Sequence, residues 1–336
     1  MRYVKSVELK ELDGLGVGIV KFTETMEVLS SAVLNGGITE ADALFIMQVP
    51  HDYDCSDPMK DIIRVRDAFG LPENSVGMMT AAEVQYVFNV KEAEYGGSNA
   101  CAIVTAGLSN QVVAGEPLVD WESAHKISLK RAAKMMAGTI NIAVVVETPL
   151  SYEGKVNLFI PLVEAKSAAM ADRGYRETGT TSDSMAVICP KGDERGSYAG
   201  TGSSIGISAA KAVREAVGYS LEIRGEHPVP VEPMKLLEKL GYGIDVMWAL
   251  SGSPMGKEEY SRALDSYLKG DGMKTFLDMA AFSADRADSL AEDGNQFIHP
   301  MVCRICSSLI GIEPNLSEGI MQGIIEAIAV DAGRIR

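Results

Sequence analysis

The feature that most constrains the fold is the alternation of short apolar runs with helix-like segments between residues 100 and 220. Short apolar runs bounded by small residues indicate buried strands, and apolar residues spaced three and four apart indicate helices. Strands separated by helices predict an α/β fold, with a mixed buried sheet that has helical cover. The predicted strands contain CAIVTA, TINIAVVVE and DSMAVICP, and the predicted helices contain WESAHKISLKRAAKMM, VNLFIPLVEAKSAAMADRG and SSIGISAAKAVREAVG.

The amino-terminal ninety residues predict strands and turns followed by a helix. Residues 3–12 and 16–23 alternate between apolar and polar side chains, as half-buried strands do. Leu34–Gly37 contains two glycines, which can supply the positive φ of a turn. Asp57–Phe69 has helical periodicity and ends before Gly-Leu-Pro. Because this meander precedes the alternating region, we expect both parallel and antiparallel pairing in the sheet.

A proline-rich segment, Glu222–Pro233, predicts a domain boundary. Three prolines lie within its last six residues, where they stiffen the chain and disfavour regular helix. We expect an α/β domain over residues 1–225 and an all-helical domain, with no assigned reaction, over residues 231–336.

Charge and hydropathy exclude several classes of function. The formal net charge of -15 disfavours a nucleic-acid partner, because phosphate backbones are bound by lysine and arginine. No apolar run reaches the length of about 20 residues that spans a bilayer. The amino terminus lacks the apolar core of a signal peptide, so we expect a cytoplasmic protein without a membrane partner.

Cysteine and histidine provide little support for a metal or redox site. Five cysteines at irregular spacing do not form a disulfide framework, and Cys303 and Cys306 are read as helical cysteines rather than ligands. The cluster HDYDC, at residues 51–55, is a minor candidate for metal binding, and Ser109 with His125 is a minor candidate for a nucleophile and base. We expect no metal site and no cofactor.

Three loops rich in small polar residues adjoin the predicted strands: Thr105–Asn110, Ala137–Asn141 and Thr178–Asp183. Glycine allows backbone N–H groups to approach a ligand, and Ser, Thr and Asn supply neutral donors and acceptors. Such loops suit an amide-rich substrate or an oxyanion, although they also suit plain turns. None matches a phosphate-binding loop, and Gly200–Gly206 opens a helix that Ser203 or Ser204 is expected to cap.

Three titratable residues near these loops are candidates for proton transfer. Asp183 immediately precedes an apolar strand, where a partly buried carboxylate can act as a base, or can cap a turn. Glu164 and Lys166 lie two residues apart on a predicted helix, so they point to different faces, and a solvated helix face explains them equally well.

Seven motifs follow one another along the chain: LSSAVLNGG, VGMMTAAEV, TAGLSN, AGTINIAVVVETPL, VEAKSAAM, GTTSD and YAGTGSSIGISAAKAV. In this order they resemble the adenosylcobinamide amidohydrolase family of archaeal corrinoid salvage. The resemblance covers roughly residues 29–217 and stops near the proline-rich segment.

The resemblance implies hydrolysis of the amide that joins the aminopropanol arm to the corrin ring, giving adenosylcobyric acid. Asp183 is the first candidate for the general base and Glu164 the second, and Lys166 would protonate the amine or hold a carboxamide. Asn110 and Asn141, with backbone N–H groups near Gly107 and Gly138, would hold the oxyanion. The substrate-binding candidates are Asn35, Gly36, Thr105, Gly107, Ser109, Asn110, Gly138, Thr139, Asn141, Thr180, Thr181 and Thr201. The cobalt corrinoid is the substrate or ligand rather than a cofactor.

Two departures from the family's pattern concern specificity and the carboxyl-terminal region. GTTSD stands where relatives have GTGTD or GTATD, so the bulkier Thr181 narrows the approach to the backbone. Some relatives carry a fused phosphatase-like domain, but residues 234–336 show no phosphatase residues. A corrinoid or tetrapyrrole carrier that binds without cleaving, and a hydrolase of a different amide, remain alternatives. The sequence also leaves a homo-oligomer open.

Overall fold

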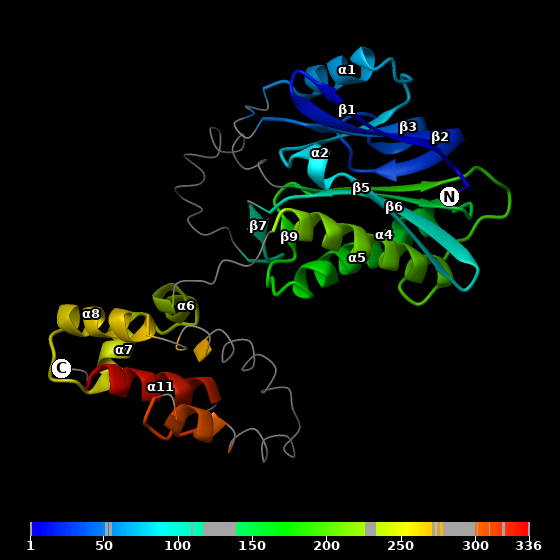
Figure 1. Cartoon of the computed structure of the whole chain (residues 1–336). Coiled ribbons are helices and arrows are strands. Elements are labelled where there is room, and N and C mark those ends of the chain that lie inside the picture. Colours follow the sequence, from blue (N-terminus) through cyan, green and yellow to red (C-terminus); the bar gives the residue numbers. More distant parts are fainter. Residues whose placement is uncertain are drawn as a thin grey trace. The chain divides into compact units, whose positions relative to one another are not determined.

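The chain forms two compact units, Met1–Pro228 and Val229–Arg336, in the computed structural model (Figure 1). The structure describes residues 2–50, 53, 56–108, 110–116, 139–225, 233–270, 273, 276–277, 300, 302–308, 310–317 and 320–334. Each unit is considered by itself below.

The first unit is built on an eight-stranded sheet with the order β4-β3-β2-β10-β8-β6-β5, in which β1 also pairs with β2. Its strands are β1 (Val4–Leu12), β2 (Leu15–Ser30), β3 (Gly37–Gln48), β4 (Val76–Thr80), β5 (Asn89–Tyr95), β6 (Ser98–Ala106), β8 (Ile140–Val146) and β10 (Ser184–Cys189). β8 pairs with β10, and β3 with β4, in parallel, while the other pairs are antiparallel. The mixed sheet predicted from the sequence is therefore confirmed. A two-stranded sheet of β7 (Gln111–Val112) and β9 (Gly179–Thr180) lies apart from this path.

Helices α4 (Tyr152–Ala171) and α5 (Ser204–Ile223) lie side by side and cover one face of β6, β8 and β10 (Figure 1). Side chains alternate along each strand, so Val104, Ile142 and Val187 pack toward these helices. Their neighbours Ile103 and Ala143 lie in a second core with residues of β2, β3 and β4. All of these strand residues are fully buried, which explains why the strands are continuous apolar runs.

The ends of the two long helices follow from their flanking residues. Ser151 and Ser203 cap α4 and α5, because each side chain accepts a hydrogen bond from a glycine N–H three residues further on. Gly174, with φ of 83°, follows the end of α4. The predicted capping of the helix after Gly200–Gly206 is thus confirmed for Ser203, while Ser204 instead hydrogen-bonds through its hydroxyl to that of Ser98, 2.8 Å away.

Two shorter helices, α1 (Pro58–Ala68) and α2 (Val84–Val87), complete the first unit. Side chains of α1 enter a third core: Ile62 and Val65 pack with residues of β2, β3 and β4. Pro58 at the start of α1 and the Asp57 side chain, which caps Lys60 N at 3.1 Å, fix where the helix begins. The helix predicted from residue 57 is therefore confirmed.

The second unit is helical, as predicted. Its helices include α6 (Pro233–Lys239), α7 (Ile244–Ser251), α8 (Lys257–Leu268) and α11 (Ile320–Ala332), together with a helical segment at 302–308. Tyr260, Leu264 and Ile325 are among its core residues. Cys306 is buried in the same core, and this burial raises the pKa of its thiol to about 11, as expected for a structural cysteine.

The helices on either side of the proline-rich segment extend into its two ends, where no helix was predicted. Glu222 and Ile223 belong to α5, and Pro233 is the first residue of α6. A proline is accepted in the first turn of a helix because the N–H that it lacks has no partner there. The helix predicted at residues 121–136 lies outside the described part of the chain.

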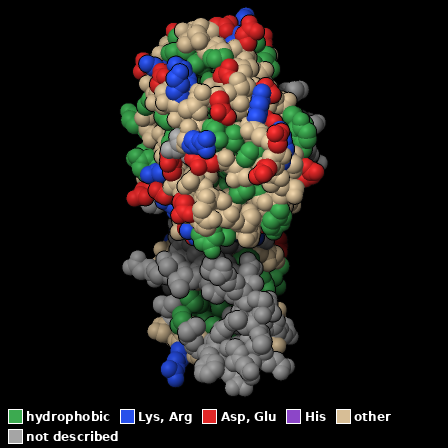
Figure 2. Space-filling view, turned by 90° about the vertical axis from the view of Figure 1, so that its right-hand side faces the viewer, with side chains coloured by type: hydrophobic (Ala, Val, Ile, Leu, Met, Phe, Trp, Pro, Cys, Tyr) green, Lys and Arg blue, Asp and Glu red, His purple; other side chains and the backbone are tan. Residues whose placement is uncertain are grey.

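The surface of the first unit carries mixed charge on the face shown in Figure 2. Lys and Arg side chains are scattered there among Asp and Glu, with hydrophobic side chains between them. Among the helices that the structure describes, none is long and apolar enough to cross a membrane.

Candidate functional site

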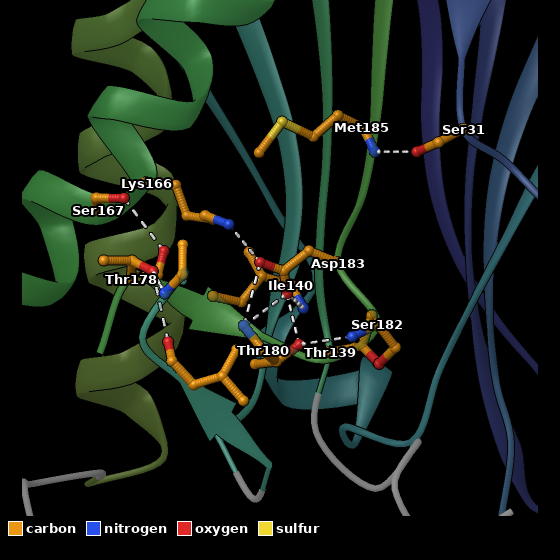
Figure 3. A network of polar contacts seen from close by, with 12 residues as sticks. Ser31, Thr139, Ile140, Lys166, Ser167, Thr178, Thr180, Ser182, Asp183 and Met185 are labelled. Atoms are coloured by element: carbon orange, nitrogen blue, oxygen red, sulfur yellow. Dashed lines mark hydrogen bonds and ion pairs between the residues drawn. The ribbon is translucent and has the colours of Figure 1, made fainter. Parts of the chain in front are cut away.

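The three polar loops predicted from the sequence meet at one edge of the main sheet. β6 runs antiparallel to β8, and β8 runs parallel to β10, so the end of β6 lies beside the starts of the other two strands. Hydrogen bonds then join the loops directly: Gly107 N donates to Thr139 O at 3.2 Å, and Thr181 N donates to Asn110 O at 3.2 Å. The hydroxyls of Thr139 and Ser182 lie 2.7 Å apart (Figure 3).

At this edge, several hydrogen bonds meet at the carboxylate of Asp183 (Figure 3). Its Oδ1 accepts hydrogen bonds from Ile140 N at 3.2 Å, from Thr180 N at 3.1 Å and from the Thr180 hydroxyl. Its Oδ2 accepts from Thr180 N at 3.2 Å and pairs with the Lys166 ammonium. Four donor groups therefore fix the carboxylate, and its negative charge is matched by one cation.

Lys166 reaches this carboxylate from the buried side of α4. Its side chain is 10% exposed and that of Asp183 is 13% exposed, so the ion pair is largely shielded from water. A shielded ion pair is screened much less by salt than a surface pair. The alternative reading of Lys166 as part of a solvated helix face is therefore wrong.

Glu164 lies on the opposite, exposed side of the same helix, as the two-residue spacing predicts. Its carboxylate accepts a hydrogen bond from the Thr201 hydroxyl at 2.7 Å. The structure thus brings Glu164 and Thr201 together, but Glu164 shows no contact with Asp183 or Lys166 among the interactions described.

A further row of hydroxyls lies close to the ion pair. Thr180 is buried, whereas Thr181 is exposed and accepts a hydrogen bond from the Asn110 amide at 2.6 Å. Ser167 on α4 donates to Thr178 O at 3.1 Å. These contacts link α4, β9 and the loop after β6 around Asp183.

Asn141 and Thr105 lie inside the sheet rather than at its rim. Both are fully buried, and the Asn141 amide nitrogen donates to Met79 O at 2.9 Å and to the Thr105 hydroxyl at 3.3 Å. A side-chain amide has two N–H hydrogens, so the donors of Asn141 are already used. Its Oδ1 is buried and has no hydrogen-bond partner among the described residues.

Gly107 similarly has its N–H group committed, to Thr139 O. A Cβ at this position would lie 2.8 Å from the Ala82 Cβ, which is too close for an ordinary contact. Glycine at 107 is therefore explained by packing between the loop after β6 and the residues after β4.

Asn35 and Gly36 lie in the turn between β2 and β3. The Asn35 amide donates to Glu73 O and Ser75 O, both at 2.9 Å, and the residue adopts a positive φ of 52°. A Cβ at Gly36 would strike the carbonyl oxygen of Ala32. Asn35 therefore joins its turn to the segment before β4, and Gly36 allows the turn itself to form; neither contacts Asp183 among the described residues.

Other sequence candidates fall outside the described residues or form no site. Ser109, Gly138 and His125 lie outside them, as does most of the HDYDC cluster. Over the ranges that the structure describes, no group of three or more His, Cys, Asp or Glu side chains could hold a metal ion.

Sequence reasoning did not assign a role to Ser31 and Ser184. Their hydroxyls lie 3.2 Å apart, and Ser31 also accepts from Met185 N at 3.0 Å and donates its own N–H to Met185 O at 2.9 Å (Figure 3). These contacts fix the start of β10 immediately after Asp183. The motif LSSAVLNGG contains Ser31, but only the pairing of β2 with β10 reveals its neighbour.

The site thus combines a fixed carboxylate, an ammonium and several hydroxyls at the end of a sheet. A carboxylate and an ammonium in contact can accept one proton and donate another in the same reaction. Neutral hydroxyl and amide groups nearby can bind a substrate rich in carboxamides. This chemistry suits hydrolysis of an amide.

Comparison with known proteins identifies one family. Residues 2–227 match the family described as CbiZ, adenosylcobinamide amidohydrolase. The adenosylcobinamide amidohydrolase of Methanosarcina mazei is 30% identical over 205 residues, which cover 58% of this chain and 90% of that protein. The protein of the same name from Halobacterium salinarum is 32% identical over 193 residues, which cover 56% of this chain and 78% of that protein.

Likeness to solved structures is weak. The PH0078 protein from Pyrococcus horikoshii OT3 is 13% identical, with a TM-score of 0.35, and the match covers 66% of this chain and 85% of that one.

Proposed function

We propose, from the premise that the chain belongs to the adenosylcobinamide amidohydrolase family, that the Lys166–Asp183 ion pair transfers the protons of the reaction. Members of this family are hydrolases that act on a C–N bond. The bond is the amide between the corrin ring and its aminopropanol arm, and the products are adenosylcobyric acid and aminopropanol. The corrinoid enters as the substrate.

The observation that carries this proposal is the ion pair itself, at the edge where three polar loops meet. Amide hydrolysis needs a base for the attacking water and an acid for the departing amine. Asp183 takes a proton as the water oxygen attacks the carbonyl carbon. Lys166 gives a proton to the nitrogen as the C–N bond breaks. Transfer of the proton from Asp183 to Lys166 then restores the starting pair.

The hydrogen bonds of Asp183 favour Oδ2 as the atom that accepts the proton. Oδ1 accepts from three donors: Ile140 N, Thr180 N and the Thr180 hydroxyl. Oδ2 accepts from the Lys166 ammonium and, at a slightly longer distance than Oδ1, from the same Thr180 N–H. When Lys166 gives up its proton, Oδ2 loses its charged partner. Donation by Lys166 and acceptance by Asp183 are therefore coupled.

Glu164 is the second candidate for the base, and its geometry supports it less well. Its carboxylate is exposed, and its described hydrogen bond is to Thr201 rather than to a cation. We propose that Glu164 and Thr201 contact the periphery of the corrin, where their polar groups can bind carboxamides.

The remaining candidates fall into two groups, those that bind substrate and those that support the loops. We propose that Asn110, Thr139 and Thr181 bind substrate, because they belong to the loops that meet beside Asp183. Thr105, Gly107 and Asn141 support the loops from within, since the donors of Gly107 and Asn141 are committed to the protein and the Thr105 hydroxyl accepts from Asn141. Asn35 and Gly36 have the same supporting role at a more distant turn.

The test is to incubate the purified full chain with adenosylcobinamide and to measure released aminopropanol. The proposal expects release in proportion to enzyme, and loss of release in Lys166→Ala and Asp183→Asn variants that remain folded. Tight binding of the corrinoid without release would instead support a carrier. Release that is unaffected by both substitutions would show that the ion pair does not take part.

A further inference from the structure

Gly179, on β9, lies directly against the Lys166–Asp183 ion pair. A Cβ at this position would fall inside van der Waals contact of both Asp183 Oδ2 and Lys166 Nζ, and 3.2 Å from Lys166 Cε. We propose that Gly179 is a positioning residue for amide hydrolysis: the missing side chain leaves the space in which Lys166 meets Asp183. This inference rests on the function proposed above, and it assigns a role to a residue that has none there.

The backbone does not require glycine at this position. Gly179 is absent from the glycines with positive φ, unlike Gly174, which has φ of 83°. It pairs with Val112 in the antiparallel ladder of β7 and β9, where any L residue can adopt the extended conformation. The need for glycine at 179 is therefore a need for space.

The atoms that a side chain would meet are also distinctive. At Gly36 and Gly206 a Cβ would strike backbone carbonyl oxygens, so those glycines protect the fold. At Gly179 the three nearest atoms that it would meet belong to the ends of two charged side chains, Asp183 and Lys166. A substitution there consequently acts on the ion pair before it acts on the backbone.

Of the two charged groups, Lys166 is the one that can move. Asp183 is tied to Thr180 and Ile140 by donors that are independent of Lys166. The lysine side chain has a flexible four-carbon stem and reaches Asp183 from a neighbouring helix, α4. A methyl group at 179 would therefore displace the ammonium from Oδ2, and it would also press against Oδ2 itself, which the donors of Thr180 and Ile140 hold.

The direct test compares Gly179→Ala with Gly202→Ala in the full chain. Gly202 is a matched control, because it is exposed, lacks a positive φ and would meet no atom within 4 Å of an added Cβ. We expect Gly179→Ala to lower kcat for aminopropanol release at least about tenfold with KM little changed, because proton transfer depends on position. Gly202→Ala should retain the wild-type kcat. A wild-type kcat in Gly179→Ala would overturn the proposal.

A double-mutant cycle with Lys166→Ala separates positioning from a general structural effect. If Gly179 acts by leaving space for Lys166, then Gly179→Ala lowers kcat by a smaller factor in the Lys166→Ala background than in the wild type. If the two losses multiply, Gly179 acts independently of the lysine and the proposal is wrong.

Thermal unfolding of the same variants tests the contact when Gly179→Ala lowers stability. The loss of Tm caused by Gly179→Ala should be smaller in the Lys166→Ala background, where the ammonium no longer occupies the space. An equal loss of Tm in both backgrounds would contradict the proposed contact. This measurement does not depend on the substrate. Absence of aminopropanol release from the wild type would therefore defeat the proposed function, while the cycle in Tm would still decide whether Gly179 makes room for Lys166.

Discussion

Lys166 and Asp183 form an ion pair between the inner face of α4 and the residue before β10, with side chains only 10% and 13% exposed. The pair joins a helix to a loop that is otherwise held by its own turn and by β8. Because the pair is largely buried, substitutions at either end should have effects that a surface ion pair would not show.

Asp183→Asn should lower kcat for aminopropanol release by about 10²- to 10⁴-fold, the range expected when a positioned acid or base is removed. Asparagine retains the size of the side chain but cannot take the proton. Steady-state release against adenosylcobinamide concentration measures the change. Asp172→Asn is the control, because Asp172 pairs with Arg214 in a more exposed ion pair at 2.7 Å. A folded Asp183→Asn enzyme with full turnover would remove Asp183 from the mechanism.

Thr180→Val should lower kcat by about 10- to 150-fold, which corresponds to loss of a hydrogen bond to a charged group worth about 1.5–3 kcal/mol. Valine has a similar shape but lacks the hydroxyl that donates to Asp183 Oδ1. Thr180→Ser keeps the hydroxyl and should stay close to the wild type. Equal losses in the serine and valine variants would indicate that shape, rather than the hydrogen bond, matters at this position.

Asn141→Leu should destabilise the first unit by about 1–3 kcal/mol, because the carbonyl of Met79 would be left buried without its donor. Urea unfolding of the two proteins at one pH measures the difference. Asn99→Leu provides a comparison, because Asn99 is exposed and its amide donates to the Glu147 carboxylate at 3.2 Å. An Asn141→Leu protein as stable as the wild type would show that the buried amide contributes no net stability.

Glu27 should make folding sensitive to acid. Its carboxylate binds the buried Lys155 at 2.6 Å and Arg195 at 2.7 Å, and the pKa of Glu27 falls to about 2, first because of the Arg195 hydrogen bond. A lowered carboxyl pKa stabilises the folded state above the unfolded value of about 4.5. This contribution, about 3 kcal/mol, is lost as pH falls from there through about 2.

The check on Glu27 is to measure the free energy of unfolding of Glu27→Gln and the wild type between pH 7 and pH 2. The deficit of the variant should be largest near neutral pH and shrink below about pH 4.5. Glu40→Gln is the control, because its partner Lys191 forms an exposed pair. A deficit for Glu27→Gln that does not change with pH would contradict the linkage.

The sequence predicts the edge of the sheet where the site forms but not the contacts within it. The runs that become β6, β8 and β10 are mostly apolar, so strands and their bounding loops are visible directly. The two-residue spacing of Glu164 and Lys166 also predicts that their side chains lie on different faces of the helix. The spacing does not predict which side chain faces inward, because that depends on how α4 packs against the strands.

Other features escape sequence reasoning because they depend on distant partners. Asn35 has the composition of a ligand-binding loop residue, yet its amide is used by backbone carbonyls about 40 residues away. Gly179 lacks a positive φ, so only its distance to Lys166 and Asp183 reveals why glycine stands there. Ser31 likewise gains its role from the pairing of β2 with β10.

The hydrogen bond from Gly107 N to Thr139 O couples the loop after β6 to the residues before β8, so that the two move together. Thr139 is followed by Ile140, whose N–H holds Asp183, so a force applied at Gly107 is transmitted to the carboxylate through two hydrogen bonds and one peptide unit. A substrate that presses on the loop after β6 would therefore adjust the position of Asp183 as it binds. Recognition of the ligand and alignment of the reacting group are then a single displacement rather than two separate events.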